Sequence, residues 1–372
     1  MPQMNRRTLV KAAIGSCLVA IGGYARVASP KCLPVVRVGA IRWDAWYDPQ
    51  GPVGKATTIS LSPPEYRFRL PFFAKIRPDS TVEIDGNRES VMDREIDYAV
   101  RAGLSYWAFV AYAPDSPMSN ALRLYLQSTK KDQLKFCILS EIAAWAHPEI
   151  TEWHIKLIAE PTYQTVLDHR PLYFLGPFND AFIEKNWGGL TQVRPLVEAF
   201  RQKIQTSGIA NPYIVALHQD AKIAAHYADV LGCDAISAYA VNHNEHAASF
   251  SRLVEEARKE WQEHADTGLS VVPMVTTGFD RRPRIDHPVP WEPTPQNPAD
   301  YRGIYYETAQ PEEIQRELED CLAWMGQNKS SVPAEAVLVY AWNENDEGGW
   351  LIPTGQSDQS RLDAVEKVLC PK

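Results

Sequence analysis

Residues 336–344 read AVLVYAWNE, an apolar run that ends in two polar residues, Asn343 and Glu344. Continuous apolar runs rich in β-branched and aromatic residues are typical of strands that are covered on both faces of a parallel sheet. Seven further runs of this kind precede it, at residues 35–43, 104–112, 134–141, 171–176, 213–218, 235–239 and 270–277. We therefore expect eight strands in one series.

Stretches with helical periodicity separate these runs. Ile314, Leu318 and Cys321 recur at the spacing of one helix face, behind Pro311 at a favourable first helical position. The same spacing occurs within residues 92–100. Eight consecutive βα units predict an α/β protein, a single (β/α)₈ or TIM barrel, rather than an open doubly wound sheet.

The two longest connections follow the first and the seventh strands, over residues 44–91 and 278–310. Loops of this length are uncommon unless they are functional or disordered. Both leave the C-terminal face of the barrel, where the active sites of such barrels are built.

The N-terminus predicts export. Arg6 and Arg7 open a segment that resembles the twin-arginine motif, and an apolar run over residues 12–20 follows. This run is shorter than the roughly 20 residues that a membrane span requires. We expect residues 1–29 to be a cleaved signal peptide and residues 30–372 to be a periplasmic or secreted barrel without a membrane span.

Charge and cysteine content exclude several classes of ligand. The formal net charge of −8 disfavours nucleic acid, which would require a basic face. No Cys or His spacing indicates a metal, and no Gly-rich phosphate loop follows the first strand, so neither a metal nor a cofactor is expected. We expect Cys137, Cys233 and Cys321 to be buried, while Cys32 and Cys370 lie near the two chain ends and could form a disulfide.

The ends of the eight strands carry a ring of aromatic, acidic and amide side chains. Aromatic faces stack on the C–H faces of sugars, while carboxylates and amides bind hydroxyl groups, so we expect a carbohydrate ligand. The residues expected to contact it are Trp43, Asp44, Trp46, Tyr112, Glu141, His218, Tyr239, Asn242, Asp280, Arg281, Trp291, Trp342, Asn343, Asp346 and Trp350.

Two glutamates at the end of the eighth run are the candidate catalytic pair. Glu344 closes the apolar strand, and Glu347 follows three residues later. Neighbouring acids of this kind can be held at different pKa values, one protonated and one ionised, as glycoside cleavage requires. The alternative for Glu141 or Glu344 is a buried structural ion pair, for example with Arg42 or Arg281.

Residues 342–348, WNENDEG, resemble the Asn-Glu-Trp-His-Glu-Gly signature at the end of the last barrel strand in glycoside hydrolase family 99, which comprises endo-α-mannosidases and endo-mannanases. The resemblance covers residues 270–355 and returns at Ser140-Glu141. It implies that Glu344 is the base at the sugar 2-hydroxyl, giving a 1,2-anhydro sugar. Glu347 would be the acid and then the base at the glycosidic oxygen, with retention of configuration, and Glu141 would contact substrate.

The sequence departs from the family at two points that matter for the substrate. Residues 140–145, SEIAAW, lack the proline-tyrosine that follows the acid of the third strand in the mannosidases. Asn345-Asp346 stands where the family has Trp-His, which makes the wall of the site more polar and more negative. We therefore expect a family-99-like branch with a substrate other than mannan. Two alternatives remain open: a non-catalytic glycan-binding or glycan-assembly protein on the same barrel, and a different barrel glycosidase chemistry.

Overall fold

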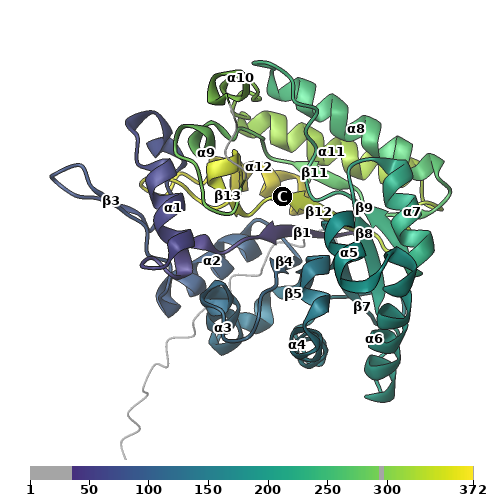
Figure 1. The fold of residues 1–372 in the computed structure, drawn as a ribbon. Coiled ribbons are helices and arrows are strands. Elements are labelled where there is room, and N and C mark those ends of the chain that lie inside the picture. Colours follow the sequence, from purple (N-terminus) through teal and green to yellow (C-terminus); the bar gives the residue numbers. More distant parts are fainter. Residues whose placement is uncertain (1–35, 293–296, 372) are drawn as a thin grey trace, which may run out of the picture. The chain divides into compact units, whose positions relative to one another are not determined.

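The computed structural model of the protein describes residues 36–292 and 297–371, in which helices surround a set of parallel strands (Figure 1). The barrel strands in chain order are β1 (Arg37–Arg42), β4 (Tyr106–Val110), β5 (Lys135–Ser140), β7 (Arg170–Leu175), β8 (Tyr213–Leu217), β9 (Ala235–Ser237), β10 (Ser270–Val271), β11 (Met274–Thr276) and β12 (Ala336–Tyr340). Each strand pairs in parallel with the next one in this order, except that β10 and β11 do not pair with each other. These two short strands together form the seventh predicted strand. The predicted α/β barrel fold is confirmed.

The seventh predicted strand is split at Val272 and Pro273, and this split closes the barrel. Ahead of it, β10 pairs with β9, and the N–H of Val272 still donates to Ile236 on that side. The carbonyl of Pro273 accepts from Leu338, and β11 then pairs with β12. Because proline has no N–H to donate, it fits the point where the chain exchanges one neighbour for the other.

The helices that cover the strands are α2 (Glu89–Arg101), α3 (Asn120–Gln127), α4 (Pro148–Ile158), α5 (Asp180–Trp187), α6 (Arg194–Thr206), α7 (Ala221–Leu231), α8 (Phe250–Asp266), α11 (Pro311–Gln327) and α12 (Ser360–Leu369). Helix α11 begins at Pro311 as expected, and a capping box between Gln310 and Glu313 fixes its start. Its buried face contains Ile314, Leu318 and Cys321, as the periodicity predicts.

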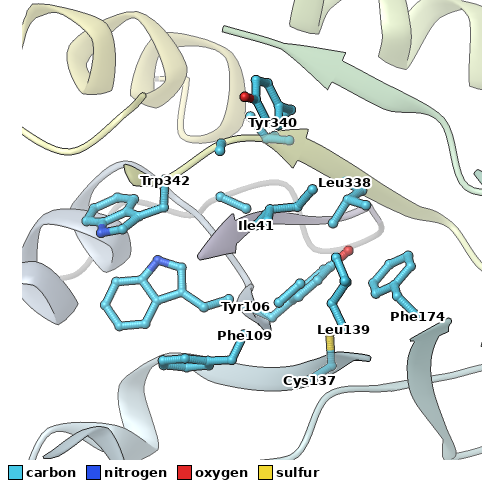
Figure 2. Close-up of a cluster of buried hydrophobic side chains, with 14 of the residues drawn as sticks. Ile41, Tyr106, Phe109, Cys137, Leu139, Phe174, Leu338, Tyr340 and Trp342 are labelled. Carbon is cyan, nitrogen blue, oxygen red and sulfur yellow. The ribbon is translucent and has the colours of Figure 1, made fainter. Parts of the chain in front are cut away.

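Large side chains from neighbouring strands fill the core, including Ile41, Tyr106 and Leu338 (Figure 2). The ring of Tyr106 lies across Gly39 of β1, where a Cβ atom would come within 2.2 Å of it. Its hydroxyl then donates to the carbonyl of Val337 at 2.8 Å. A glycine on β1 is therefore required for one tyrosine to connect three adjacent strands.

The two long connections contain secondary structure of their own. The first holds α1 (Pro52–Leu61) and the hairpin of β2 (Lys75–Ile76) and β3 (Val82–Glu83), and the second holds α9 (Arg282–Asp286) and α10 (Pro298–Arg302). Within the described part of the chain, no helix is both long and apolar enough to cross a membrane.

Two N-terminal expectations concern residues outside the described part. The signal peptide at residues 1–29 falls there and remains a prediction. Cys370 is disulfide-bonded, but Cys32, its expected partner, also lies outside the described residues. Of the other cysteines, Cys137 and Cys321 are free and buried, and Cys233 is free and half-buried.

A buried ionic cluster centred on Arg42 supports the end of strand β1. The Arg42 side chain is fully buried and pairs with Asp44 at 2.8 Å and with Glu95 of α2 at 2.5 Å. Tyr47 and Trp342 both donate to Glu95, at 2.6 and 2.8 Å. Burial raises the pKa of Asp44 to about 7 despite the neighbouring Arg42, so the single cation does not fully offset the cost of burying this carboxyl group.

We expect Arg42→Met to lower the free energy of unfolding by about 3–5 kcal/mol, because it leaves two carboxyl groups buried without their cation. Urea unfolding followed by circular dichroism measures the change. The matched control is Arg101→Met, which breaks an exposed pair with Asp363 at 2.8 Å and should cost less than about 1 kcal/mol. Equal losses in the two variants would contradict the assignment.

Candidate active site

A cavity of about 730 Å³ opens at the C-terminal ends of the strands. Its size is in the range of pockets that bind small molecules. Among the expected site residues, those in its wall are Trp43, Tyr112, Glu141, Tyr239, Asn242, Arg281, Trp291, Glu344 and Glu347. The structure therefore brings together side chains from strand ends that lie 300 residues apart in the chain.

The two glutamates reach the cavity on a tight turn after strand β12. Glu344 ends β13 (Asn343–Glu344), which pairs with β14 (Gly349–Trp350) in a short hairpin. Between them, a single turn of 3₁₀-helix, η7 (Asn345–Glu347), returns the chain so that Glu347 also lines the cavity.

Two glycines allow this turn to pack against the loop after strand β11. Gly348 has a φ of +91°, and a Cβ there would come within 2.4 Å of the backbone nitrogen of Asp280. A Cβ on Gly278 would lie 2.2 Å from the carbonyl oxygen of Gly348. The close approach lets the N–H of Asp280 donate to the carbonyl of Glu347 at 2.6 Å, which fixes the backbone that carries this glutamate.

Glu344 is buried and is hydrogen-bonded mainly to a tyrosine. The hydroxyl of Tyr239 donates to its Oε1 at 2.6 Å, while the guanidinium of Arg284 lies 3.6 Å from its Oε2. Burial raises the pKa of Glu344 well above its usual range, and the charge of Glu347 raises it further. Arg284 and Tyr239 act in the opposite direction but do not outweigh these effects.

At Glu347, neighbouring positive charges outweigh the effect of burial on the pKa. Its Oε2 accepts a hydrogen bond from Tyr340 at 2.6 Å, and its Oε1 is bound by Arg284 and lies 3.6 Å from Nε of Arg281. Burial favours the neutral form, but the two guanidinium groups outweigh it and lower the pKa of Glu347. Glu344 is therefore the member of the pair that keeps its proton as the pH rises, and Glu347 is the member that is ionised.

Aromatic side chains form one side of the cavity. The rings of Trp43 and Trp291 lie 5.5 Å apart and tilted, and the guanidinium of Arg284 lies over both. The indole N–H of Trp43 donates to the hydroxyl of Tyr112 at 2.7 Å, which fixes the orientation of its ring. Trp291 remains 38% exposed, so its face is available to a ligand.

The other expected contact residues do not lie in the cavity wall. They are Asp44, Trp46, His218, Asp280, Trp342, Asn343, Asp346 and Trp350. Several of them are instead buried beneath it as supports. Trp342 is fully buried against Glu95, and Asn343 accepts from the backbone N–H of Trp43 at 2.9 Å and donates to Asp44 at 3.2 Å.

Three of these residues are engaged in ionic or aromatic contacts. Asp280 is bound by Arg69 and pairs with Arg282 at 2.7 Å. The ring of Trp350 is covered by a guanidinium, that of Arg361, at 3.6 Å. Asp346 is 1% exposed and is bound by a buried guanidinium, so it does not add free negative charge to the wall as its sequence position suggested.

Trp46 and His218 are held by other contacts. Trp46 is 1% exposed and packs edge-on against Phe73. The ring of His218 accepts from the N–H of Asp220 at 3.0 Å, which turns it toward the start of α7. Both residues therefore shape the loops rather than the cavity.

Sequence reasoning missed Arg284 and Glu292, which both line the cavity and form an ion pair at 2.8 Å. It also missed Phe279 and Gln219. A signal for Arg284 was present, because several carboxylates at one buried site require a cation, and the sequence offers Arg-Arg-Pro-Arg at residues 281–284. Arg281 and Arg284 face the acids, whereas Arg282 pairs with Asp280, and the sequence does not show this division.

The cavity offers carboxylate, guanidinium, phenol and amide groups. Among the described residues, no group of three or more His, Cys, Asp or Glu side chains is arranged to hold a metal ion. Acids with unlike pKa values in one cavity can donate and accept protons in a single reaction.

Comparisons with known proteins identify the fold. No protein-family model matches the chain, and no curated protein sequence matches it. The endo-α-mannosidase of glycoside hydrolase family 99 from Bacteroides thetaiotaomicron is similar over 89% of this chain and 95% of its own, with a TM-score of 0.53 and 12% identity.

Two further solved structures are similar to this chain. A second family 99 endo-α-mannosidase structure, in complex with bis-tris-propane, covers 88% of this chain and 95% of its own, with a TM-score of 0.52 and 13% identity. A family 138 enzyme that targets pectin rhamnogalacturonan II covers 92% of this chain and 39% of its own, at a TM-score of 0.41 and 10% identity. The family 99 likeness confirms the fold expected from the resemblance.

We expect Gly348→Ala to destabilise the protein by about 1–3 kcal/mol, because a side chain there is strained at positive φ and collides with the backbone of Asp280. Guanidinium chloride unfolding measures the loss. The control is Gly326→Ala near the end of α11, where a Cβ meets nothing within 4 Å. That substitution should be neutral or slightly stabilising, since alanine favours helix. A neutral Gly348→Ala would show that the turn does not need this glycine.

Proposed function

We propose that this chain is a retaining glycoside hydrolase that acts on an oligo- or polysaccharide, with Glu344 and Glu347 as its catalytic residues. The observation that carries the proposal is the pair itself: two carboxyl groups of opposite pKa direction line one cavity at the C-terminal end of a barrel. The fold shared with family 99 endo-α-mannosidases and the resemblance of residues 342–348 to their signature support it.

A pair that holds one proton meets the requirements of glycoside cleavage. One carboxylic acid protonates the glycosidic oxygen as its bond to the sugar breaks, and one carboxylate acts as the base. In the chemistry that the resemblance implies, the base removes the proton of the 2-hydroxyl, and the 2-oxygen displaces the leaving group to give a 1,2-anhydro sugar. Water then opens this ring, and two inversions at the anomeric carbon give net retention.

The walls of the cavity suit a sugar. Trp43 and Trp291 offer ring faces for C–H stacking, and Asn242, Gln219 and Glu141 can bind hydroxyl groups. We also propose that the protein works outside the cytoplasm, because residues 1–29 have the character of a twin-arginine signal peptide.

Replacement of either catalytic glutamate tests the proposal. We expect Glu344→Gln and Glu347→Gln each to lower kcat by a factor of about 10³ or more while leaving glycan binding in place. Glu319→Gln, on the exposed side of α11, is the matched control and should keep full activity. Activity is measured by reducing-end release from a panel of glycans. A wild-type protein that binds glycans but cleaves none would favour the glycan-binding alternative.

The stereochemical outcome is a separate expectation. Proton NMR of the first product formed should show the anomer of the substrate, before mutarotation mixes the two forms. Release of the opposite anomer would contradict the 1,2-anhydro route while leaving the glycosidase assignment intact.

A further inference from the structure

A second cavity, of about 470 Å³, lies between helices α5 and α7, and we call it the outer cavity. The residues that line it come from α5, from the turn that follows α5 and from the first two turns of α7 (Figure 1). None of them belongs to the wall of the cavity that holds Glu344 and Glu347, which we call the main cavity.

The walls of the outer cavity continue from the wall of the main cavity. Strands β7 and β8 are parallel neighbours, so α5 and α7 both start at the C-terminal end of the barrel. Pro177 after β7 and Gln219 after β8 line the main cavity. Asp180 and Lys222, each three residues further on, line the outer cavity. Three residues of extended chain span at most about 11 Å, so one glycan chain can reach from one cavity into the other.

Side-chain caps fix the helix starts that border the outer cavity. At the start of α5, the side chain of Asn179 accepts a hydrogen bond from the N–H of Phe182 at 2.9 Å. At the start of α7, Asp220 accepts from the N–H groups of Lys222 and Ile223 at 2.9 and 3.0 Å. Caps of this kind satisfy N–H groups that a helix leaves without partners, so both walls keep their place without a ligand.

A tyrosine joins the two walls. The ring of Tyr227, on α7, stacks on that of Phe178 with centroids 4.1 Å apart, and its hydroxyl donates to Asp180 of α5 at 2.7 Å. Phe178 directly follows Pro177, which lines the main cavity. The stacked pair therefore ties the outer cavity to the edge of the main cavity.

The surface of the outer cavity suits a sugar chain. Ile183, Leu190 and Ile223 make one part of it apolar, and Ile223 remains 40% exposed. Glu184 and Lys222 are exposed, and among the described residues their side chains have no hydrogen-bond partner. Ligand sites in proteins typically combine an apolar lining with a few polar groups that fix orientation. The C–H faces and hydroxyl groups of a sugar match both parts.

The charges around the outer cavity favour a ligand without a strong charge of its own. Helix α5 contributes the carboxyl groups of Asp180 and Glu184, and α7 contributes the ammonium of Lys222 and the imidazole of His226. Because groups of both signs border the same space, neither a polyanion nor a polycation is attracted as a whole. A neutral polysaccharide meets no such conflict.

We propose that the outer cavity binds a distal part of the glycan chain that the main cavity cleaves, so that long chains are better substrates than short ones. The inference rests on the proposed glycosidase function. It identifies the substrate as a chain that reaches from Glu344 and Glu347 to Lys222 and Ile223, which is a polysaccharide rather than a short oligosaccharide.

Affinity electrophoresis tests this binding without relying on cleavage. The native gels contain α-mannan, xylan, pectin or dextran, and the parent protein carries Glu347→Gln so that it does not cut them. We expect retardation in at least one gel. In that gel, Lys222→Ala combined with Ile223→Ala should weaken the apparent affinity about five- to tenfold, because the apolar and the polar contacts are both lost.

The matched control is Lys185→Ala combined with Leu196→Ala. It also removes an exposed lysine and an aliphatic side chain of similar exposure, 37% for Leu196, but neither residue lines either cavity. The control should keep the affinity of the parent. If circular dichroism shows that the Lys222 and Ile223 variant does not fold, Glu184→Ala on the opposite wall is the second variant, and it should weaken retardation in the same gel.

Three results would overturn the proposal. One is equal retardation of the parent and the variant that lacks Lys222 and Ile223, and another is the absence of retardation in every gel. The third is a change of oligomeric state in that variant on size-exclusion chromatography, which would assign the outer cavity to contact between copies of the chain.

Cleavage separates this inference from the proposed function. For the glycan that is cut in the panel, the ratio of kcat/KM for the polymer to that for its shortest cleaved fragment should fall about fivefold or more in the same variant. An unchanged ratio would overturn the distal contact but leave the glycosidase assignment intact. A wild-type protein that cleaves nothing would contradict the glycosidase assignment, whereas weaker retardation of the variant would still support the outer cavity as a glycan site.

Discussion

The contact of Arg284 with Asp346 and Glu347 is the interaction on which the organisation of the site depends. A buried carboxylate is costly unless a cation and hydrogen bonds compensate for its lost hydration. Here one guanidinium compensates for several carboxylates, which obliges the loop after strand β11 to pack on the turn after strand β12. The glycine contact between Gly278 and Gly348 makes that approach sterically feasible. The ionic contacts and the backbone conformation therefore both favour the packing of this loop against this turn.

Beneath the cavity, further ionic clusters fasten the loops to the barrel. Arg42 with Glu95 holds the end of strand β1 against helix α2, and Arg69 binds Asp280 and the carbonyl of Asn345, at 3.5 Å in the latter case. Buried polar networks of this kind hold side chains in one arrangement because an unmade hydrogen bond is expensive in a medium of low polarity. Many residues at the strand ends thus serve to place Glu344 and Glu347, the proposed catalytic pair, rather than to line the cavity.

The eight strands could be predicted because short, continuous apolar runs are typical of buried strands. The break at Pro273 was not, since it depends on which neighbour each residue of the seventh run faces. At the site, too, some features could be predicted from the sequence and others could not. Glu344 and Glu347 could be named from their place after strand β12, whereas Trp342, Asn343 and Asp346 stand beside them in sequence and point into the protein.

The sequence by itself determined the barrel, the location of the site at the strand ends and the identity of the acid pair, because each is encoded in a local pattern. Only the tertiary structure decided which of the two acids keeps a proton. That property depends on the burial of the two carboxyl groups and on Arg284, some sixty residues away in the chain, whose guanidinium lies over the rings of Trp43 and Trp291. Electrostatic energies depend on distance and exposure in space, and neither can be read from the order of residues along a chain.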